Sequence, residues 1–297
     1  MEIRVLRYFL MAAREENITK AAQLLHITQP TLSRQLQQLE EELGTRLFER
    51  SSHNIRLTED GQLLKRRAQE IAAMVDKTEK EFCHSGEDVS GEVSIGSGET
   101  KSVHELAEML CRFQEEYPAV AFDFYTANAD DIKERLDKGL LDIGLLTEPA
   151  DITKYNFIRL KRREKWGGGL VRRDSRLAEK QSIEPEDLLQ IPLLMVKRPL
   201  VQTELANWFG DCYNRIHIAA TYNLINNAAI LVEKGLGCAL CFDLGVSYEK
   251  LCFIPLSPAV ETGAVIVWKK DQALSKAVDR LLIYLKKYIS GISANPQ

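Results

Sequence analysis

The stretch NITKAAQLLHITQPTLSRQLQQLEEEL, residues 17–43, decides the fold of the first part of the chain. Its pattern predicts two helices joined by a short turn. Asn17 or Thr19 can cap the first helix, because either side-chain oxygen accepts a hydrogen bond from a free backbone N–H at the helix start. Thr28 can cap the second helix in the same way, and Pro30 lies in its first turn, where a missing N–H costs nothing. The stretch therefore predicts a helix-turn-helix.

The second helix of this pair is predicted to have one apolar face and one polar face. Its leucines recur at spacings of four, three and four residues, so they form one stripe: Leu32, Leu36, Leu39 and Leu43. The opposite face holds Thr31, Arg34, Gln37 and Gln38. Arginine and glutamine on a helix that enters the major groove can read base edges. The alternative is an ordinary helical hairpin with a solvated polar face, because helix-turn-helix patterns are short.

The segment that follows, GTRLFERSSHNIRLTEDG at residues 44–61, predicts a small two-stranded wing. Gly44 is a typical end for a helix. Ile55 and Leu57 alternate with polar neighbours, as in a short strand. The wing would carry the cationic side chains of Arg50 and Arg56, with His53 between them.

Residues 21–61, AAQLLHITQPTLSRQLQQLEEELGTRLFERSSHNIRLTEDG, resemble the LysR-type transcriptional regulators nearly without a gap. The resemblance implies a sequence-specific regulator that binds double-stranded promoter or operator DNA and is controlled by a small-molecule effector. It also implies a homodimer or homotetramer and contact with RNA polymerase. The residues that match the DNA-reading segment of the family are Thr28, Gln29, Pro30, Thr31, Ser33, Arg34 and Gln37. We expect Arg34 and Gln37 to contact bases.

Other side chains of this region are expected to contact phosphates or the minor groove, which fixes register without reading much sequence. They are Ser33, Arg50, His53 and Arg56. The whole chain has a net charge of −4, so any affinity for DNA must come from a local patch. Eight cations lie in the first 58 residues: Arg4, Arg7, Arg14, Lys20, Arg34, Arg46, Arg50 and Arg56. No apolar run approaches the ~20 residues that span a bilayer, which predicts a cytoplasmic protein without a membrane partner.

The long segment at residues 59–87 predicts a single linker helix. Apolar residues recur along it at heptad spacing, which indicates a partner helix: Leu64, Ala68, Ile71, Val75 and Phe82. The resemblance favours dimerisation through this helix. The alternative is that the stripe packs against its own domain.

Beyond residue 91, predicted strands and helices alternate, which indicates an α/β region with parallel sheets. The resemblance implies a two-lobed effector-binding domain over residues 91–297, like periplasmic binding proteins, with two crossing strands between the lobes. Lobe I would comprise residues 91–161 and 267–297, and lobe II residues 162–266. The expected architecture is thus an N-terminal all-α winged helix-turn-helix domain at residues 1–58 (helix-turn-helix 18–37), the linker helix and an α/β effector domain.

The glycine-rich turn at residues 96–102 is the first candidate for a ligand site, because ligands of open α/β sheets bind near the carboxyl ends of strands. Free N–H groups, hydroxyls and Lys101 suit an anion such as a carboxylate, although Glu99 opposes one unless it points away. The full candidate set for an anionic effector is Thr100, Lys101, Ser102, Thr147, Arg198, Gln202, Thr203 and Thr221. The alternatives are that the turn residues merely cap a helix and that Arg198 is a solvated cation.

No catalytic pattern is present: the chain has no GxSxG, no HExxH and no phosphate loop with GK[ST]. Cys238 and Cys241 form a CxxC in a strand-like apolar run, where they would point to opposite faces and stay buried. We expect no metal, no cofactor and no enzyme activity. An enzyme with its substrate between the lobes lacks a nucleophile or acid–base pair. An architectural DNA-binding protein would leave the α/β region unexplained.

Overall fold

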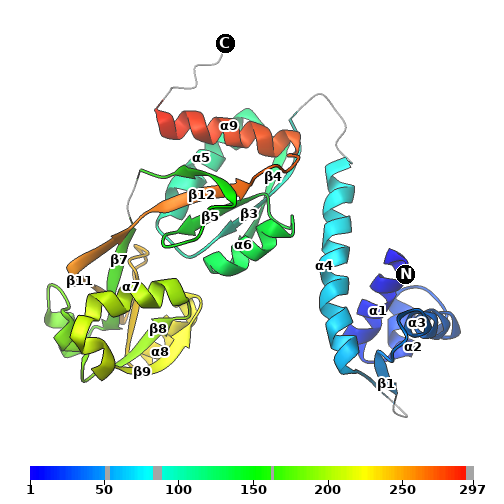
Figure 1. Ribbon diagram of the computed structural model, residues 1–297, viewed down its shortest axis with the longest axis horizontal. Helices are drawn as coiled ribbons and strands as arrows, with labels where there is room; N and C mark the ends of the chain where they lie inside the picture. The colour runs from blue at the N-terminus through cyan, green and yellow to red at the C-terminus, as the bar shows by residue number, and fades with distance from the viewer. Residues whose placement is uncertain (51–53, 83–88, 162–163, 292–297) are drawn as a thin grey trace. The chain divides into compact units, whose positions relative to one another are not determined.

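The structure is a computed structural model that describes residues 1–50, 54–82, 89–161 and 164–291. The chain forms two compact units, Met1–Cys83 and His84–Gln297, and each is described by itself (Figure 1). Within the described ranges no helix is both long enough and apolar enough to cross a membrane.

The N-terminal unit contains the predicted helix-turn-helix and wing. Its elements are α1 (Ile3–Glu15), α2 (Ile18–Leu24), α3 (Gln29–Leu43), β1 (Phe48–Arg50), β2 (Ile55–Leu57) and α4 (Glu59–Phe82). Asn17 rather than Thr19 caps α2, since its side chain accepts a hydrogen bond from the Lys20 N–H at 2.9 Å. Thr28 caps α3 as predicted, and α3 ends at Gly44, which adopts φ 68°. The positive φ favours glycine because it has no Cβ.

The leucine stripe of α3 forms part of the core, but it is one residue shorter than predicted. Leu32, Leu36 and Leu39 are at most 1% exposed and pack with Phe9 of α1. Leu43 is 41% exposed, so its assignment to the buried stripe is wrong. Leu43 is the last residue of α3, and the chain turns away at the next residue before any element covers it.

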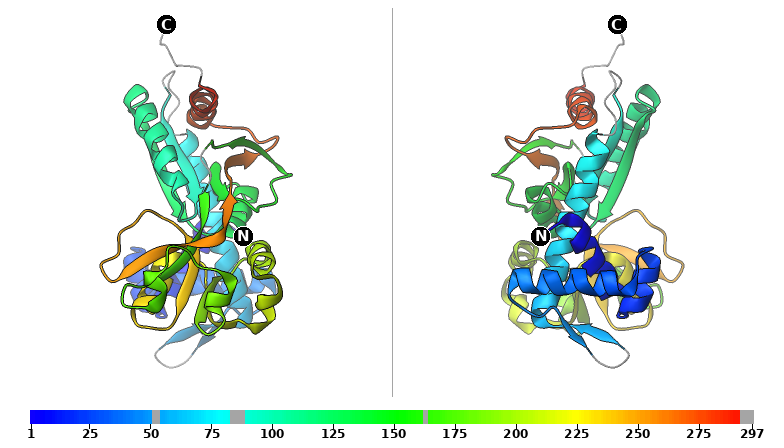
Figure 2. Two further views of the ribbon diagram at one scale, coloured as in Figure 1. Left: turned by 90° about the vertical axis from the view of Figure 1, so that its left-hand side faces the viewer. Right: turned by 90° about the vertical axis from the view of Figure 1, so that its right-hand side faces the viewer.

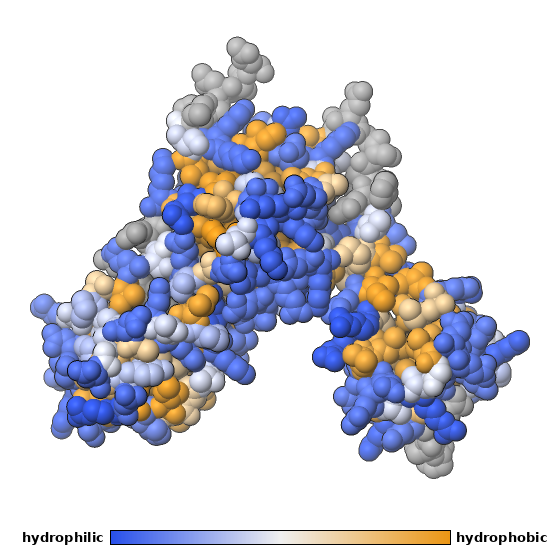
Figure 3. Space-filling view, in the orientation of Figure 1, coloured by the Kyte–Doolittle hydropathy of each residue, from blue (hydrophilic) through white to orange (hydrophobic). Residues whose placement is uncertain are grey.

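Part of the apolar stripe of α4 packs against the core of its own unit, and part of it stays exposed. Ala68 is 0% exposed and Leu64 is half-buried, both against the core of the N-terminal unit. The prediction that Ala68 contacts a partner chain is therefore wrong, because it has no surface to offer. Ile71 is 39% exposed and Val75 half-exposed, in a region of α4 and α1 where Figure 3 shows apolar surface. The Phe82 side chain lies outside the described residues.

The C-terminal unit contains two five-stranded sheets, one in each predicted lobe. Lobe I has the strand order β4-β3-β5-β12-β6 and lobe II the order β11-β7-β10-β8-β9. The elements of lobe I are β3 (Gly91–Ser97), α5 (Ser102–Glu116), β4 (Val120–Thr126), α6 (Ala129–Asp137), β5 (Ile143–Thr147), β6 (Tyr155–Arg159), β12 (Ala264–Lys269) and α9 (Lys276–Ser290). Helices α5 and α9 pack together on one face of this sheet, and α6 covers the other (Figures 1 and 2).

Lobe II is built from strands, α-helices and short 3₁₀ helices around its own core. Its strands and α-helices are β7 (Glu164–Arg172), β8 (Pro192–Val196), α7 (Pro199–Phe209), β9 (His217–Tyr222), α8 (Ile225–Glu233), β10 (Cys238–Phe242) and β11 (Leu251–Thr262). Its 3₁₀ helices are η1 (Arg176–Glu179), η2 (Pro185–Leu188) and η3 (Gly210–Arg215). The clusters that fill it involve α7 on one side and α8 on the other.

Both sheets are mixed, so the prediction of parallel sheets is only partly correct. β3 pairs in parallel with β4 and β5, but β12 runs antiparallel to β5 and β6. In lobe II, β7 runs antiparallel to β10 and β11. The reason is the two crossings between the lobes: β12 re-enters lobe I at the end from which β6 leaves it. Ala264 pairs with Thr147, so lobe I resumes at residue 264 rather than at 267.

Candidate functional site

The polar face of α3 is exposed in the N-terminal unit. Arg34 and Gln37 are solvent-accessible, and so are Thr28, Gln29, Pro30 and Thr31, whereas Ser33 is half-buried. The Thr28 and Thr31 hydroxyls lie 2.8 Å apart in a mutual hydrogen bond, and the Gln37 amide donates to Glu41 Oε1 at 3.1 Å. The first two turns of α3 therefore present a continuous polar surface with Arg34 as its cation.

The positive charges of this unit divide into paired and unpaired groups. The cations of α1 and α2 pair with acids: Arg4 with Glu2, Arg7 with Asp76, Arg14 with Glu15, and Lys20 with Glu15. Among the described residues, Arg34, Arg46 and Arg56 form no ion pair. Arg34 and the wing arginines therefore contribute positive charge to the local patch that a chain of net negative charge needs to attract phosphates. They are not alone in this, because Lys65 and Arg66 lie on α4 of the same unit. His53 and the Arg50 side chain lie outside the described residues.

Glu40 fixes the wing to α3. Its Oε1 accepts hydrogen bonds from the Leu47 N–H at 2.7 Å and the Phe48 N–H at 3.1 Å, at the start of β1. The Thr58 hydroxyl donates to the Arg46 carbonyl at 2.7 Å and so ties the other end of the wing to the same segment. The sequence pattern gave Glu40 no role, although a carboxylate at the edge of a leucine stripe, just before unpaired N–H groups, is the signal.

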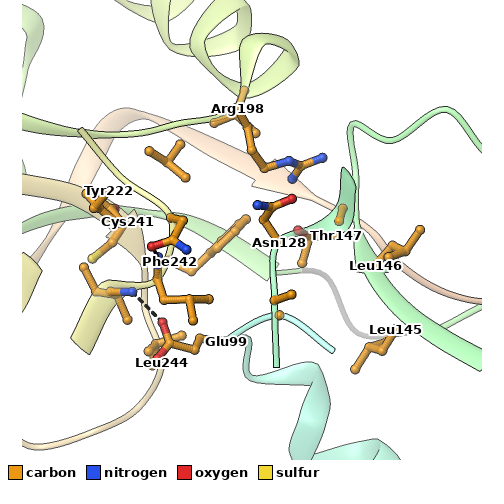
Figure 4. A pocket seen from close by; sticks show the side chains of 18 residues that line it. Glu99, Asn128, Leu145, Leu146, Thr147, Arg198, Tyr222, Cys241, Phe242 and Leu244 are labelled. Atoms are coloured by element: carbon orange, nitrogen blue, oxygen red, sulfur yellow. Dashed lines mark hydrogen bonds between the residues drawn. The ribbon is translucent and has the colours of Figure 1, made fainter. Parts of the chain in front are cut away.

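The second candidate site is a cavity of about 70 Å³ between the lobes of the C-terminal unit (Figure 4). Lobe I contributes the segments after β3, β4 and β5, and lobe II those around β8, β9 and β10. The lining residues are Gly98, Glu99, Ala127, Asn128, Ala129, Leu145, Leu146, Thr147, Val196, Arg198, Val201, Tyr222, Asn223, Leu224, Ile225, Cys241, Phe242 and Leu244. The cavity is small beside the ~300–1,000 Å³ pockets that hold drug-sized ligands.

Arg198 is the buried cation of this cavity. Its side chain reaches from the start of α7 toward Asn128 and Thr147 of lobe I (Figure 4), and the residue is only 5% exposed. One guanidinium nitrogen donates to the Pro149 carbonyl at 2.9 Å. Its Nε is buried without a hydrogen-bond partner and lies 3.8 Å from an Asp130 oxygen. Burial lowers the pKa of Arg198, and the nearby Asp130 carboxylate partly offsets this lowering. An unpaired N–H in such a place is costly unless a ligand satisfies it.

Only two of the eight predicted effector residues, Thr147 and Arg198, line the cavity. Thr100 and Ser102 are 7% and 0% exposed at the start of α5, where the Thr100 hydroxyl accepts from the Ser102 N–H at 3.3 Å. The Thr100 hydroxyl thus binds the first N–H of α5, although the N-cap residue of this helix, Lys101, makes no side-chain cap hydrogen bond. Four more lie away from the lining. Lys101 is one of them; of the others, Gln202 donates to the Val196 carbonyl at 3.0 Å, Thr203 donates to the Pro199 carbonyl at 3.0 Å, and Thr221 is exposed on β9.

Side chains of the turn after β3 instead contact lobe II. Lys101 forms an ion pair with Asp243, and Glu99 accepts hydrogen bonds from the start of α8. Asn128 was not predicted as a site residue, although it lines the cavity and caps α6 by accepting from the Asp130 and Asp131 N–H groups. Asn128 follows a strand end, so the rule that selected Thr147 applied to it too.

The two cysteines of the CxxC are buried on opposite faces of β10, as predicted. Cys238 packs in the cluster with Leu193, and Cys241 in the cluster with Ile225. Burial raises the pKa of Cys238 to about 12 and raises that of Cys241 as well. Both thiols are therefore protonated near neutral pH, which is typical of core cysteines rather than reactive ones.

Comparison with known proteins places both units. Residues 3–62 match the model of the bacterial regulatory helix-turn-helix protein, lysR family, and residues 86–290 match that of the LysR substrate binding domain. The chain is 29% identical over 296 residues to the uncharacterised HTH-type transcriptional regulator YybE of Bacillus subtilis (strain 168), covering 98% of this chain and 100% of that protein. It is 28% identical over 243 residues to the regulator IlvY of Escherichia coli (strain K12), with 81% and 80% covered.

Solved structures agree on the fold. CbnR, determined at full length with its target DNA, aligns with a TM-score of 0.75 at 20% identity over 97% of this chain and 99% of that one. The fold, the exposed recognition helix and the two family matches lead to one assignment. The chain belongs to the LysR family, whose members regulate transcription, and it is a DNA-binding transcriptional regulator with an effector-binding domain.

Proposed function

We propose that this regulator reads its operator with Arg34 and Gln37. Thr28, Gln29, Pro30, Thr31 and Ser33 would complete the α3 contact, and Arg50, His53 and Arg56 would hold the backbone from the wing. The exposure of the α3 face and the lack of an ion pair at Arg34 and Arg56, within the described residues, support this assignment. Glu49, also a described residue, lies opposite Arg56 in the wing without forming an ion pair with it. Phosphate contacts then fix the register, and the α3 side chains read bases in the major groove.

We further propose that the effector is a compact anion held by Arg198, with Thr147 and Asn128 beside it. The observation that carries this proposal is the buried Nε–H of Arg198, a residue of the cavity lining: this N–H has no hydrogen-bond partner, and the Asp130 oxygen nearest to it lies 3.8 Å away. A carboxylate pairs well with guanidinium, because it accepts two parallel hydrogen bonds. The small cavity favours a ligand of few atoms or one that enters as the lobes separate. Such a ligand shifts the equilibrium of the lobes only if it binds one arrangement better.

A thermal-shift screen of small carboxylates on the full chain tests this assignment. A ligand that binds only the folded state raises the melting temperature, and Arg198→Met should abolish that rise. Arg215→Met is the matched control, because Arg215 is exposed in the same lobe and should leave the rise unchanged. If Arg198→Met retains the full rise, the anion is bound elsewhere and the proposal fails.

Assembly and context complete the proposal. A homodimer or homotetramer would present two recognition helices to two half-sites, and Ile71 and Val75 are residues of the predicted α4 stripe that keep surface for a partner helix. We propose contact with RNA polymerase at the promoter, a cytoplasmic location, and binding of the effector without turnover. Sedimentation of the full chain with Ile71→Glu tests the assembly: the charge should shift it toward monomer.

A further inference from the structure

Helix α8 begins on the wall of the cavity without a cap from its own sequence. Its N-cap residue is Leu224, whose side chain cannot accept a hydrogen bond. The cap comes instead from Glu99, which lies 126 positions earlier in the chain and in the other lobe. Glu99 Oε2 accepts from the Ile225 backbone N–H at 2.5 Å (Figure 4). Its Oε1 accepts from the side-chain amide of Asn226 at 2.7 Å. A carboxylate of lobe I thus caps the first turn of a helix of lobe II.

The position of this carboxylate is one that free anions commonly take. The N-terminus of a helix carries partial positive charge and unpaired N–H groups. Here that N-terminus belongs to the cavity lining together with Glu99 itself, Asn223 and Ile225. The same cavity holds Arg198, which is 5% exposed and whose Nε has no hydrogen-bond partner, with an Asp130 oxygen 3.8 Å away. It therefore has two anion-binding positions, one filled by the chain and one unfilled.

A second contact of the same turn acts in the same direction. Lys101, two residues after Glu99, forms an ion pair with Asp243 in the segment that follows β10. Residues 99 and 101 thus hold lobe II from one side of the cavity, while Arg198 reaches back to the Pro149 carbonyl of lobe I. The side chains of this turn thus bind the opposite lobe.

We propose that Glu99 is a built-in anionic ligand of the cavity and a specificity-determining residue. It occupies the anion position at the start of α8 and holds the lobes together. An acid group of the effector is thereby directed to Arg198, and a second acid group is repelled from the α8 wall. This inference rests on the proposed function only in that an effector enters this cavity.

The test is chemical rescue of Glu99→Ala with formate, measured on the full chain. All three tryptophans lie after residue 160, at Trp166, Trp208 and Trp268, so melting followed by tryptophan fluorescence reports the C-terminal unit alone. Loss of the cap should lower that melting temperature by about 2–4 °C. Formate at about 0.1 M, against chloride at equal ionic strength, should raise the melting temperature of Glu99→Ala more than that of the wild type.

Two further variants keep the result interpretable. Glu184→Ala removes a capping carboxylate that serves η2 within lobe II, so it should show no extra response to formate. Glu99→Gln fills the space without charge and should also lack the extra response. An extra response in Glu184→Ala, or none in Glu99→Ala, overturns the inference. If Glu99→Ala does not fold, Glu99→Gln decides: it must melt below the wild type, and equal stability overturns the inference.

The same measurements in an Arg198→Met background separate the inference from the proposed function. The response of the wild type to formate should vanish with Arg198, whereas the extra response of Glu99→Ala should persist. Persistence of both responses contradicts the Arg198 site and supports the α8 position. Loss of the extra response supports Arg198 and contradicts a separate position at α8.

Discussion

The recognition segment and the turn after β3 show similar sequence patterns, but the structure places their side chains differently. Both are short polar stretches at helix starts, rich in hydroxyls and with one cation. In α3 the predicted side chains, apart from the half-buried Ser33, are exposed on the predicted polar face. In residues 99–102 the two hydroxyls are buried at the start of α5, and the two charged residues cross to the other lobe. A face within one helix follows from local periodicity, whereas the occupants of a cavity between two lobes do not.

The largest expected effect tests the local side of this comparison. Leu36→Ala should destabilise the N-terminal unit by about 2–5 kcal/mol, because it leaves a cavity in a fully buried stripe. Leu43→Ala, at the exposed end of the same stripe, should change stability by less than ~0.5 kcal/mol. Urea denaturation followed by circular dichroism measures both. Equal losses would mean that the stripe extends to the end of α3.

A smaller effect tests the function of the exposed face. Arg34→Ala should weaken binding to the operator by about 1–3 kcal/mol and reduce discrimination against other sequences. Arg4→Ala is the control, because Arg4 is exposed on α1 and paired with Glu2. Fluorescence anisotropy on operator and scrambled duplexes gives both affinities. Unchanged operator binding by Arg34→Ala would remove Arg34 from the DNA site.

The smallest effect tests whether the effector binds at the turn after β3 or in the cavity between the lobes. Thr100→Val should cost about 1 kcal/mol of stability, because it removes the acceptor of the Ser102 N–H, and should leave the response to a bound carboxylate intact. Thr147→Val should leave stability nearly unchanged but reduce the response to the carboxylate, since Thr147 lines the cavity and is only half-buried. Thermal melting with and without the carboxylate measures both quantities. A response lost in Thr100→Val and kept in Thr147→Val would restore the turn as the effector site.

Much of the fold follows from patterns that the chain shows locally. The helix-turn-helix, the wing and most strands of the effector domain lie where periodicity placed them, because each depends on a spacing of apolar residues and a nearby cap or breaker. The direction of β12 and β7 was not predictable in this way. Strand direction depends on where the chain re-enters a sheet, and the crossings between lobes leave no local signal.

The sequence by itself indicated the family, through the resemblance of residues 21–61. It also determined the exposed polar face of α3 and the burial of Cys238 and Cys241, since these depend on spacing along single elements. Only the tertiary structure decided that Ala68 serves its own core and that Glu40 holds the wing. It also decided that Glu99 caps a helix 126 positions away. Each of these depends on which distant backbone N–H or apolar surface lies opposite a side chain. That partner is fixed by the packing of whole elements and not by the neighbours of the side chain in the chain.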